Sequence, residues 1–468
     1  MSFPLDELSA RVERELQLLS YPARRWVLPR TTRAGEPILD VLIVGAGQGG
    51  LATAFGLLRE RVDNVLVVDE NPEGLAGPWL RFARMRTLRT PKHLTGPDLG
   101  VPSLTPRAWH EAQHGEGSWE TLDFLPKESW AAYLTWYRKT LSLPVQFDTR
   151  VGALRWNETE RAFEVPCTHE NREALRYARR VVLATGIEGS GHWQVPKIVE
   201  DALPTTRYAH TRWDIDFAAL RGKRVAVLGA GASAFDNAAT ALEAGAKEVR
   251  MFFRRAQLVD VNPYRWAEFV GFLAHLGDMP DRDKWRFIRH ILRMGQLPPR
   301  DTLARARAHP GLCFEPSAPW TSVAQRDDGS ITIHTPRGDF ETDYVIVGTG
   351  FVTDLRARPE LARIEGDIAR WSDRFTPPPD QAHEDLSRHP YLGPSFEFTE
   401  RTAGAAPWLQ YVYNYTFGCL LSLGFGGASI SGMKYSIPRL VSGITRSFFR
   451  EDGEHYYQSL AAWNEREF

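Results

Sequence analysis

The chain is poor in cysteine, carries no excess of charge of either sign and contains no long apolar run. Its three cysteines, Cys167, Cys313 and Cys419, form no C-x-x-C pair and no cysteine–histidine cluster at the spacing of a zinc site. A disulfide scaffold, a structural zinc ion and a redox-active dithiol close in sequence are therefore not expected. We predict no metal site.

The charges of the chain nearly cancel. Its 57 Lys and Arg residues stand against 58 Asp and Glu residues, which gives a formal net charge of -1. Without a large field of one sign, neither nucleic acid nor a charged membrane is expected as a partner. The N-terminus lacks a basic segment followed by an apolar one, and no run approaches the about 18 apolar residues of a membrane span. We expect a cytoplasmic protein without a membrane span, either monomeric or a homo-oligomer.

The remaining composition is that of a globular protein of more than one domain. Of its 468 residues, 43% are hydrophobic and 25% are charged, and 15 are tryptophan. This length exceeds what one hydrophobic core usually serves, so two domains are expected. Apolar residues recur at helical spacing over residues 5–20 and again over 127–142, which predicts two amphipathic helices.

A complete dinucleotide-binding fingerprint, G-A-G-Q-G-G, occupies residues 45–50. A short apolar run at 40–44, of the kind buried in a parallel sheet, precedes it, and a helical pattern follows. The first glycine permits the tight turn, the second lets the backbone approach a pyrophosphate, and the third allows close packing of helix on strand. The predicted cofactor-binding residues are Gly45, Gly47, Gln48 and Gly50, at a helix N-terminus that favours a phosphate.

The strand predicted next, at 64–68, ends in two carboxylates, Asp69 and Glu70. An acidic side chain at this point accepts hydrogen bonds from a ribose. The register favours Asp69, and Glu70 remains the alternative. The first unit is therefore predicted to bind a dinucleotide.

A second fingerprint, G-A-G-A-S-A, occupies residues 229–234, with alanine at the place of the third glycine. The strand predicted after it ends in Arg254 and Arg255, where the first unit has Asp and Glu. Guanidinium groups bind a 2′-phosphate through forked, charge-assisted hydrogen bonds, which favours NADP(H) over NAD(H). Two solvated surface arginines are the alternative. The other predicted contacts of this unit are Gly229, Gly231 and Ser233.

Two such units in one α/β chain predict two Rossmann-like dinucleotide-binding domains, one for FAD and one for NADPH, between which hydride passes. One occupied site and one vestigial site is the alternative.

Three further motifs extend the pattern. Gly77-Pro78-Trp79 follows the acidic strand end, Ala184-Thr185-Gly186 ends another strand, and residues 343–351 read D-Y-V-I-V-G-T-G-F, with Gly350 near the end. Together with the two fingerprints, these motifs resemble those of the class B flavoprotein monooxygenases, which comprise flavin-containing, Baeyer–Villiger and ornithine or lysine N-hydroxylating enzymes. The resemblance implies that Gly77 and Trp79 lie near the isoalloxazine and that Thr185 marks the point where the chain leaves the flavin domain. Thr185 and Gly350 are also predicted to bind a cofactor.

The resemblance also implies a domain order. A leading helix and connector, 1–37, precede an FAD-binding domain in two parts, 38–205 and 329–468. The NADPH-binding domain, 206–328, is inserted between these parts.

The activity implied by the resemblance is an oxygenation. NADPH reduces FAD, reduced flavin reacts with O₂, and a C4a-(hydro)peroxyflavin transfers one oxygen atom to a small-molecule substrate. N-hydroxylation is slightly favoured over S-oxygenation and ketone insertion. One alternative is an FAD- and NAD(P)H-dependent reductase or dehydrogenase without oxygen transfer, and the scarcity of cysteine weakens its dithiol branch. Another is a non-catalytic nucleotide-binding protein.

Three residues are candidates for a catalytic role. Arg89 stands in L-R-T-P-K, where the flavin-containing monooxygenases have an asparagine that helps hold the oxygenated flavin. His210 is what remains of a family motif before the second fingerprint, and we expect it near the nicotinamide ribose or phosphate. Asn414 lies in a glycine-rich tail, residues 411–430, that is expected to fold back on the first domain.

A basic run lies in an irregular segment from residue 74 to 118. Segments of this length without regular structure are usually functional. The run is suited to a carboxylate-bearing substrate or to the cofactor phosphates, and a solvated basic face is the alternative. Its members are Arg84, Arg86, Arg89 and Lys92.

Overall fold

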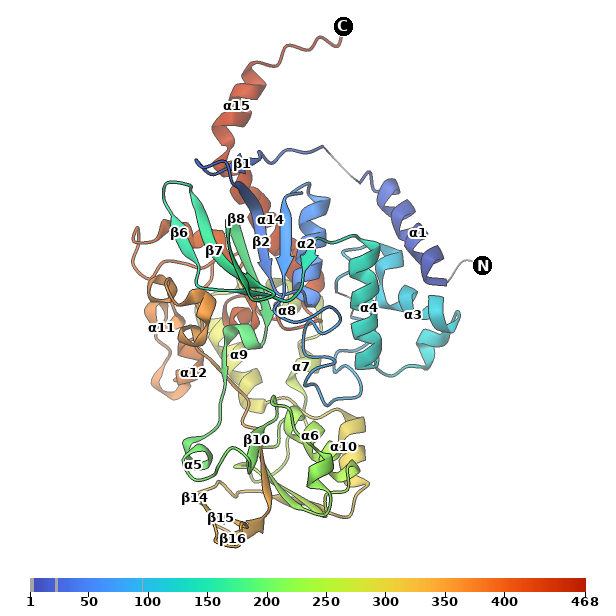
Figure 1. Ribbon diagram of the computed structural model, residues 1–468, viewed down its shortest axis with the longest axis vertical. Coiled ribbons are helices and arrows are strands. Elements are labelled where there is room, and N and C mark those ends of the chain that lie inside the picture. Colours follow the sequence, from blue (N-terminus) through green and yellow to red (C-terminus); the bar gives the residue numbers. More distant parts are fainter. Residues whose placement is uncertain (1–3, 22–23, 95) are drawn as a thin grey trace.

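The computed structural model describes residues 4–21, 24–94 and 96–468, which form two larger sheets, two smaller ones and the helices around them (Figure 1). The larger sheet has nine strands in the order β4-β3-β2-β8-β7-β5, with β1 beside β2, β19 beside β8 and β6 beside β7. Its strands are β1 (Arg30–Thr31), β2 (Pro37–Val44), β3 (Val65–Val68), β4 (Val145–Gln146), β5 (Thr149–Val151), β6 (Arg155–Asn157), β7 (Ala162–His169), β8 (Arg172–Gly186) and β19 (Val412–Thr416).

The first predicted strand–helix–strand unit is confirmed as β2, α2 (Gln48–Arg59) and β3, with β2 and β3 parallel. Val41, Leu42 and Ile43 are fully buried, as expected of a strand covered on both faces. The two predicted helices are confirmed as α1 (Pro4–Leu18) and α4 (Lys127–Thr140). Helix α3 (Pro106–His114) lies in the segment predicted to be irregular.

The second predicted unit forms a five-stranded sheet in the lower half of Figure 1. All its strand pairs are parallel, in the order β10-β17-β11-β12-β13. A small antiparallel sheet, β14-β15-β16, shares a buried apolar cluster with it. The elements are β10 (Tyr208–His210), β11 (Arg224–Leu228), α6 (Ala232–Glu243), β12 (Glu248–Phe252), α10 (Arg300–Arg307), β13 (Leu312–Glu315), β14 (Ser322–Gln325), β15 (Ile331–Thr335), β16 (Gly338–Thr342) and β17 (Tyr344–Val347).

The strand pairing differs from the predicted division at residue 328. β17 lies between β10 and β11 of the second sheet, so residues 329–347 accompany that sheet and not the flavin part. The glycine-containing signature at 343–351 marks the end of a strand in the second unit, and the return to the first unit begins only after it. We therefore propose that the inserted domain ends after β17.

A layer of helices lies between the nine-stranded and the five-stranded sheet (Figure 1). Trp285, Trp371 and Leu421, which are fully buried, belong to its apolar core. Its helices are α7 (Pro263–Trp266), α8 (Val270–His275), α9 (Asp281–Met294), α11 (Trp371–Arg374), α12 (Glu384–Ser387) and α13 (Leu420–Leu423). Two short elements, β9 (Gly191–Trp193) and β18 (Phe351–Thr353), pair antiparallel where the chain passes between the units. A further short helix, α5 (Lys197–Glu200), follows β9.

The C-terminal segment folds back on the first sheet, as predicted. β19 pairs in parallel with β8, and helix α14 (Met433–Glu451) packs on α2 so closely that a Cβ added at Gly56 would lie 2.8 Å from Val441. Helix α15 (Gly453–Ala461) then projects from the body at the top of Figure 1. Among the described helices, none has the length and apolarity to cross a membrane.

Candidate functional site

A cleft of about 1660 Å³ lies between the two units. Its walls include the residues that follow β2, β3 and β8 and the first turns of α6, which is where nucleotide ligands bind in parallel sheets. A small-molecule pocket usually measures about 300–1000 Å³, so this cleft has room for more than one ligand.

The first glycine turn has the geometry that a dinucleotide requires. Gly45 has a φ of +108°, and a Cβ there would lie 2.6 Å from the carbonyl oxygen of Ala184. A Cβ at Gly50 would lie 1.8 Å from the carbonyl oxygen of Gly45, whereas one at Gly47 would meet nothing within 4 Å. Gly47 is also the N-cap of α2, and because glycine has no side chain it offers the first turn no capping hydrogen bond. The turn therefore presents backbone N–H groups and open space for a phosphate.

The two carboxylates after β3 differ in their surroundings. Asp69 is buried and accepts hydrogen bonds from the backbone N–H of Ala46 at 2.8 Å and from that of Asn71 at 2.9 Å. Glu70 is exposed, and its carboxylate lies 3.7 Å from Arg150. Both residues line the cleft. Asp69 therefore fixes the shape of the glycine turn, and Glu70 is free to reach a ligand.

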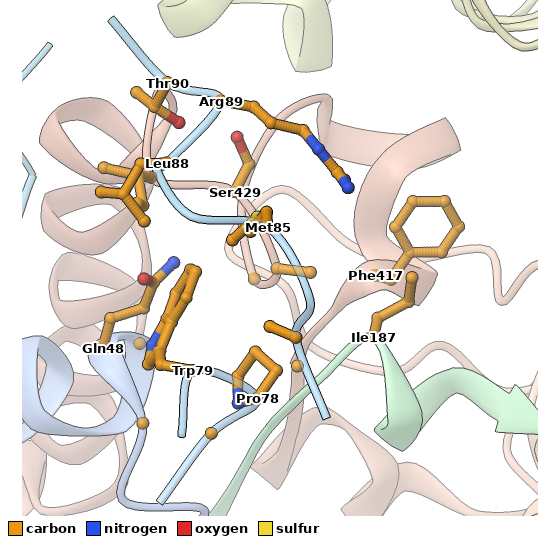
Figure 2. Close-up of a pocket in the computed structure, with 18 of the residues that line it drawn as sticks. Gln48, Pro78, Trp79, Met85, Leu88, Arg89, Thr90, Ile187, Phe417 and Ser429 are labelled. Atoms are coloured by element: carbon orange, nitrogen blue, oxygen red, sulfur yellow. The ribbon is translucent and has the colours of Figure 1, made fainter. Parts of the chain in front are cut away.

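The part of the cleft next to this turn has aromatic and polar walls (Figure 2). Trp79 meets Trp130 edge to face at 6.4 Å, and the indole N–H of Trp130 donates to Oε1 of Gln48 at 3.1 Å. Gly77 has a φ of +76°, which turns the chain toward Trp79. Thr185 lines the cleft, and its buried hydroxyl has no hydrogen-bond partner among the described residues. Phe417 and Ser429, from the returning C-terminal segment, close the opposite side.

The second glycine turn repeats the first. Gly229 has a φ of +117°, and a Cβ there would lie 2.4 Å from the carbonyl oxygen of Gly348. A Cβ at Gly231, the N-cap of α6, would meet nothing within 4 Å. Ser233 in the first turn of α6 lines the cleft. Gly350 has a φ of +87° just beyond β17 and is not among the residues that line the cleft; its carbonyl oxygen accepts a hydrogen bond from Nε2 of His210.

The two arginines predicted to bind the 2′-phosphate are not among the residues that line the cleft. Arg255 donates to the carbonyl oxygens of Arg293 and, at 2.7 Å, Met294, so it caps the C-terminal end of α9. Arg254 is exposed at the end of β12. Of the predicted pair, Arg254 is the residue left for a phosphate.

Two of the three catalytic candidates lie behind the wall of the cleft. His210 is fully buried: its Nδ1 accepts from the backbone N–H of Arg212 at 3.1 Å, and its Nε2 donates to the carbonyl oxygen of Gly350 at 3.2 Å. Burial lowers the pKa of His210 to about 4, against the opposing effect of the Gly350 bond. Both ring nitrogens of this neutral histidine are bonded to backbone groups, and His210 is not among the residues that line the cleft.

Asn414 is likewise buried, on β19, where its Oδ1 accepts from the hydroxyl of Thr416 at 2.6 Å. It is not among the residues that line the cleft. The structure thus brings Arg89 alone of the three candidates to the site.

The predicted basic run docks on neighbouring segments. Arg84 donates to the carbonyl oxygen of Trp213 at 3.0 Å, and Lys92 donates to that of Trp119 at 2.7 Å. Arg86 and Arg89 form ion pairs with two carboxylates of α6. A solvated basic face is therefore not what the structure shows.

Several cleft residues carried no motif that would have identified them in the sequence. They are contributed by segments that come together only in the tertiary structure. Asp236 had a weak signal, since it is a carboxylate near the N-terminus of a helix that is rich in alanine, five residues after Gly231. The others are Phe82, Tyr264, Arg265, Arg300, Arg212 and Phe425.

Residues 42–269 match the family model of the pyridine nucleotide-disulphide oxidoreductases. Over its whole length, the chain is similar to the FAD-dependent urate hydroxylase of Xanthomonas campestris pv. campestris, with 45% identity over 464 residues that cover 99% of this chain and 97% of that protein. The chain belongs to the class B flavoprotein monooxygenases. The predicted family is thereby confirmed, and with it an FAD-dependent oxidoreductase of the FAD- and NADP-binding type.

Solved structures of this class share the fold. The ornithine hydroxylase of Pseudomonas aeruginosa is similar with a TM-score of 0.67 and 14% identity, covering 87% of this chain and 99% of that one. The ornithine N-hydroxylase of Kutzneria sp. 744, solved with reduced FAD, NADP⁺ and L-ornithine, gives a TM-score of 0.66 and 17% identity over 88% of this chain and 100% of that one. At such identities the likeness concerns the two-domain α/β fold alone.

The cysteines separate this chain from dithiol reductases. Cys167, Cys313 and Cys419 are all free. Cys419 lines the cleft, but burial raises the pKa of its thiol to about 12, which leaves it protonated and unreactive. A relay through a disulfide needs two sulfurs, and the cleft offers one.

Proposed function

We propose that this protein is an NADPH- and FAD-dependent monooxygenase that hydroxylates urate. The full-length relative named as a urate hydroxylase is the observation that carries the substrate. The overall reaction takes urate, O₂, NADPH and a proton to hydroxylated urate, NADP⁺ and water. One oxygen atom enters the substrate and the other leaves as water.

FAD fits the first turn. The open space at Gly47 admits a pyrophosphate to the N-terminus of α2, and the carboxylates of Asp69 and Glu70 stand where the ribose would lie. The isoalloxazine would extend past Thr185 toward Trp79. The returning loop before α14 lines the same part of the cleft, and the α14 dipole favours negative charge on a reduced ring.

NADPH fits the second turn, with its pyrophosphate at Gly231 and Ser233 and its 2′-phosphate near Arg254. When bound, FAD accepts hydride from NADPH and then activates O₂. The protein's own task is to align the two rings, hold the substrate and keep water out.

The walls of the cleft suit a planar, oxygen-rich and acidic heterocycle such as urate. Trp79, Phe417 and Phe425 offer apolar faces against which a flat ring packs, and Arg212 and Arg265 offer guanidinium donors to ring oxygens. Aliphatic amines such as ornithine, named as a substrate of the structural neighbours, lack the flat ring that these aromatic faces would accept.

The proposal is tested by O₂ uptake of the FAD-loaded protein with NADPH. We expect urate to stimulate uptake and to lose its ultraviolet absorbance, and ornithine, lysine and a thioether to have no effect. After anaerobic reduction by NADPH and addition of O₂, a flavin spectrum that is neither oxidised nor reduced is expected. Direct reoxidation without a hydroxylated product would favour a reductase instead.

A further inference from the structure

The loop between β3 and α3 contacts α6 of the second unit through two ion pairs of unequal burial. The inner pair joins Nη2 of Arg89 to Oδ2 of Asp236 at 2.6 Å, with the Asp236 side chain 3% exposed. The outer pair joins Nη2 of Arg86 to Oε1 of Glu243 at 2.9 Å, with the Arg86 side chain 62% exposed. Arg89 and Asp236 line the cleft, and Arg86 and Glu243 do not.

Both oxygens of the Asp236 carboxylate are in use. The hydroxyl of Thr302, on α10, donates to Oδ1 at 2.9 Å while Arg89 occupies Oδ2. A second nitrogen of Arg89, Nη1, lies 3.4 Å from Oε1 of Gln296, in the segment before α10. The carboxylate thus connects α6, α10 and the loop of the first unit, and a buried charge pair of this kind holds a defined geometry.

The pair connects the two halves of the site. Asp236 lies on α6, five residues beyond Gly231, where NADPH is proposed to place its pyrophosphate. Arg89 stands in the part of the cleft that also holds Gln48 and Trp79, on the flavin side (Figure 2). Hydride transfer requires its two reacting atoms to be held about 3–3.5 Å apart, and a small misplacement is costly in rate.

We propose that Arg89 and Asp236 are positioning residues for hydride transfer, their ion pair fixing the helix that carries NADPH against the loop that borders FAD. The inference rests on the proposed placement of the two cofactors. In the step itself, hydride leaves NADPH, which becomes NADP⁺, and FAD gains two electrons. Neither residue exchanges electrons or protons in it.

The test is anaerobic stopped-flow reduction of the FAD-loaded protein by saturating NADPH. We expect Arg89→Ala and Asp236→Asn each to lower the limiting rate of flavin reduction about 10- to 100-fold, with FAD content unchanged. The double variant is expected to be no slower than the slower single one, because both changes remove the same ion pair. Arg89→Lys, which keeps the charge, is expected to restore part of the rate.

Arg86→Ala is the matched control, since it removes the outer pair between the same loop and the same helix. Glu243 keeps a two-pronged contact with Arg305, at 2.8 Å to each oxygen, so the reduction rate should stay within about twofold. Reduction by dithionite, which needs no nicotinamide alignment, should be equal in all variants.

If the unaltered protein is reduced by NADPH, an unchanged reduction rate in Asp236→Asn would overturn this inference and leave the proposed function standing. A variant whose remaining holoprotein reduces at the normal rate, with only FAD content or melting temperature lowered, would also overturn it. An unaltered protein that binds no FAD, or is not reduced by NADPH, would overturn the proposed function and this inference together.

Discussion

The two glycine turns of this protein share one backbone and differ at the strand end beside them. In each, the first glycine's N–H donates to the end of the next strand: Gly45 to Val68 at 2.7 Å, and Gly229 to Phe252 at 2.8 Å. The strand registers match Val44 with Val68 and Leu228 with Phe252. The residues that directly follow β3 and β12 are therefore equivalent positions. This position is Asp69 beside the first turn and Phe253 beside the second.

The difference shows how one fold is adapted to two cofactors. Asp69 closes the first turn through its bond to the Ala46 N–H, which an aromatic ring at the second turn is unable to do. One residue further, Glu70 is matched by Arg254, so the sign of the charge at the adenosine end is reversed. We therefore expect the stability of the first turn to depend on the Asp69 side chain. We expect the second turn to select its ligand through the charge of Arg254.

The largest effect is expected at the third glycine. Gly50→Ala places a Cβ 1.8 Å from the carbonyl oxygen of Gly45, so the free energy of unfolding should fall by about 3 kcal/mol and bound FAD should be lost. The equivalent residue of the second turn is already alanine, and Ala234→Gly should cost only about 0.5–1 kcal/mol. For both variants, denaturant unfolding measures the stability, and the flavin absorbance per protein measures the bound FAD. Equal effects at the two positions would contradict the comparison.

The next effect concerns the acid that closes the first turn. Both oxygens of Asp69 accept from N–H donors, namely Ala46 on one oxygen and the backbone and side chain of Asn71 on the other. Asp69→Asn leaves one acceptor oxygen and turns an amide NH2 toward a donor, so we expect a loss of about 2 kcal/mol in the free energy of unfolding. Glu70→Gln, at an exposed position, should change it by less than about 0.5 kcal/mol. If Glu70→Gln weakens FAD binding more than Asp69→Asn does, Glu70 is the ribose contact and Asp69 is purely structural.

A third experiment separates folding from binding at the second turn. A Cβ at Gly231 meets no protein atom within 4 Å, so Gly231→Ala should leave the melting temperature and the FAD content unchanged. It would fill the space meant for the pyrophosphate, and KM for NADPH should rise about tenfold, or 1.4 kcal/mol. Steady-state kinetics check this. An unchanged KM would contradict the proposal that the pyrophosphate of NADPH binds at this turn.

The smallest expected effect is on cofactor choice. Arg254→Ala should lower the preference for NADPH over NADH about fivefold, or about 1 kcal/mol, as expected for one lost hydrogen bond to a phosphate. Arg255→Ala should leave the preference unchanged, because its guanidinium caps α9. The ratio of kcat/KM for the two nucleotides decides between them. A change in Arg255→Ala alone would reverse the assignment.

The sequence predicted both glycine turns because each is local: strand, turn and helix follow within about 30 residues. It also predicted that β19 and α14 return to the first sheet. It failed where the answer depends on distant segments. The partner of Arg89 is 147 positions away, at Asp236, and His210 is buried by the crossing at Gly350. The boundary that we propose for the inserted domain, after β17, rests on the pairing of β17 with β10 and β11, which its own residues do not reveal.

The central claim, oxygen transfer to urate at the expense of NADPH, is tested most directly with ¹⁸O₂. The account predicts that each NADPH oxidised in the presence of urate yields one hydroxylated product molecule that carries one labelled oxygen atom. Consumption of NADPH and O₂ with all the label recovered as hydrogen peroxide, and urate left intact, would contradict it.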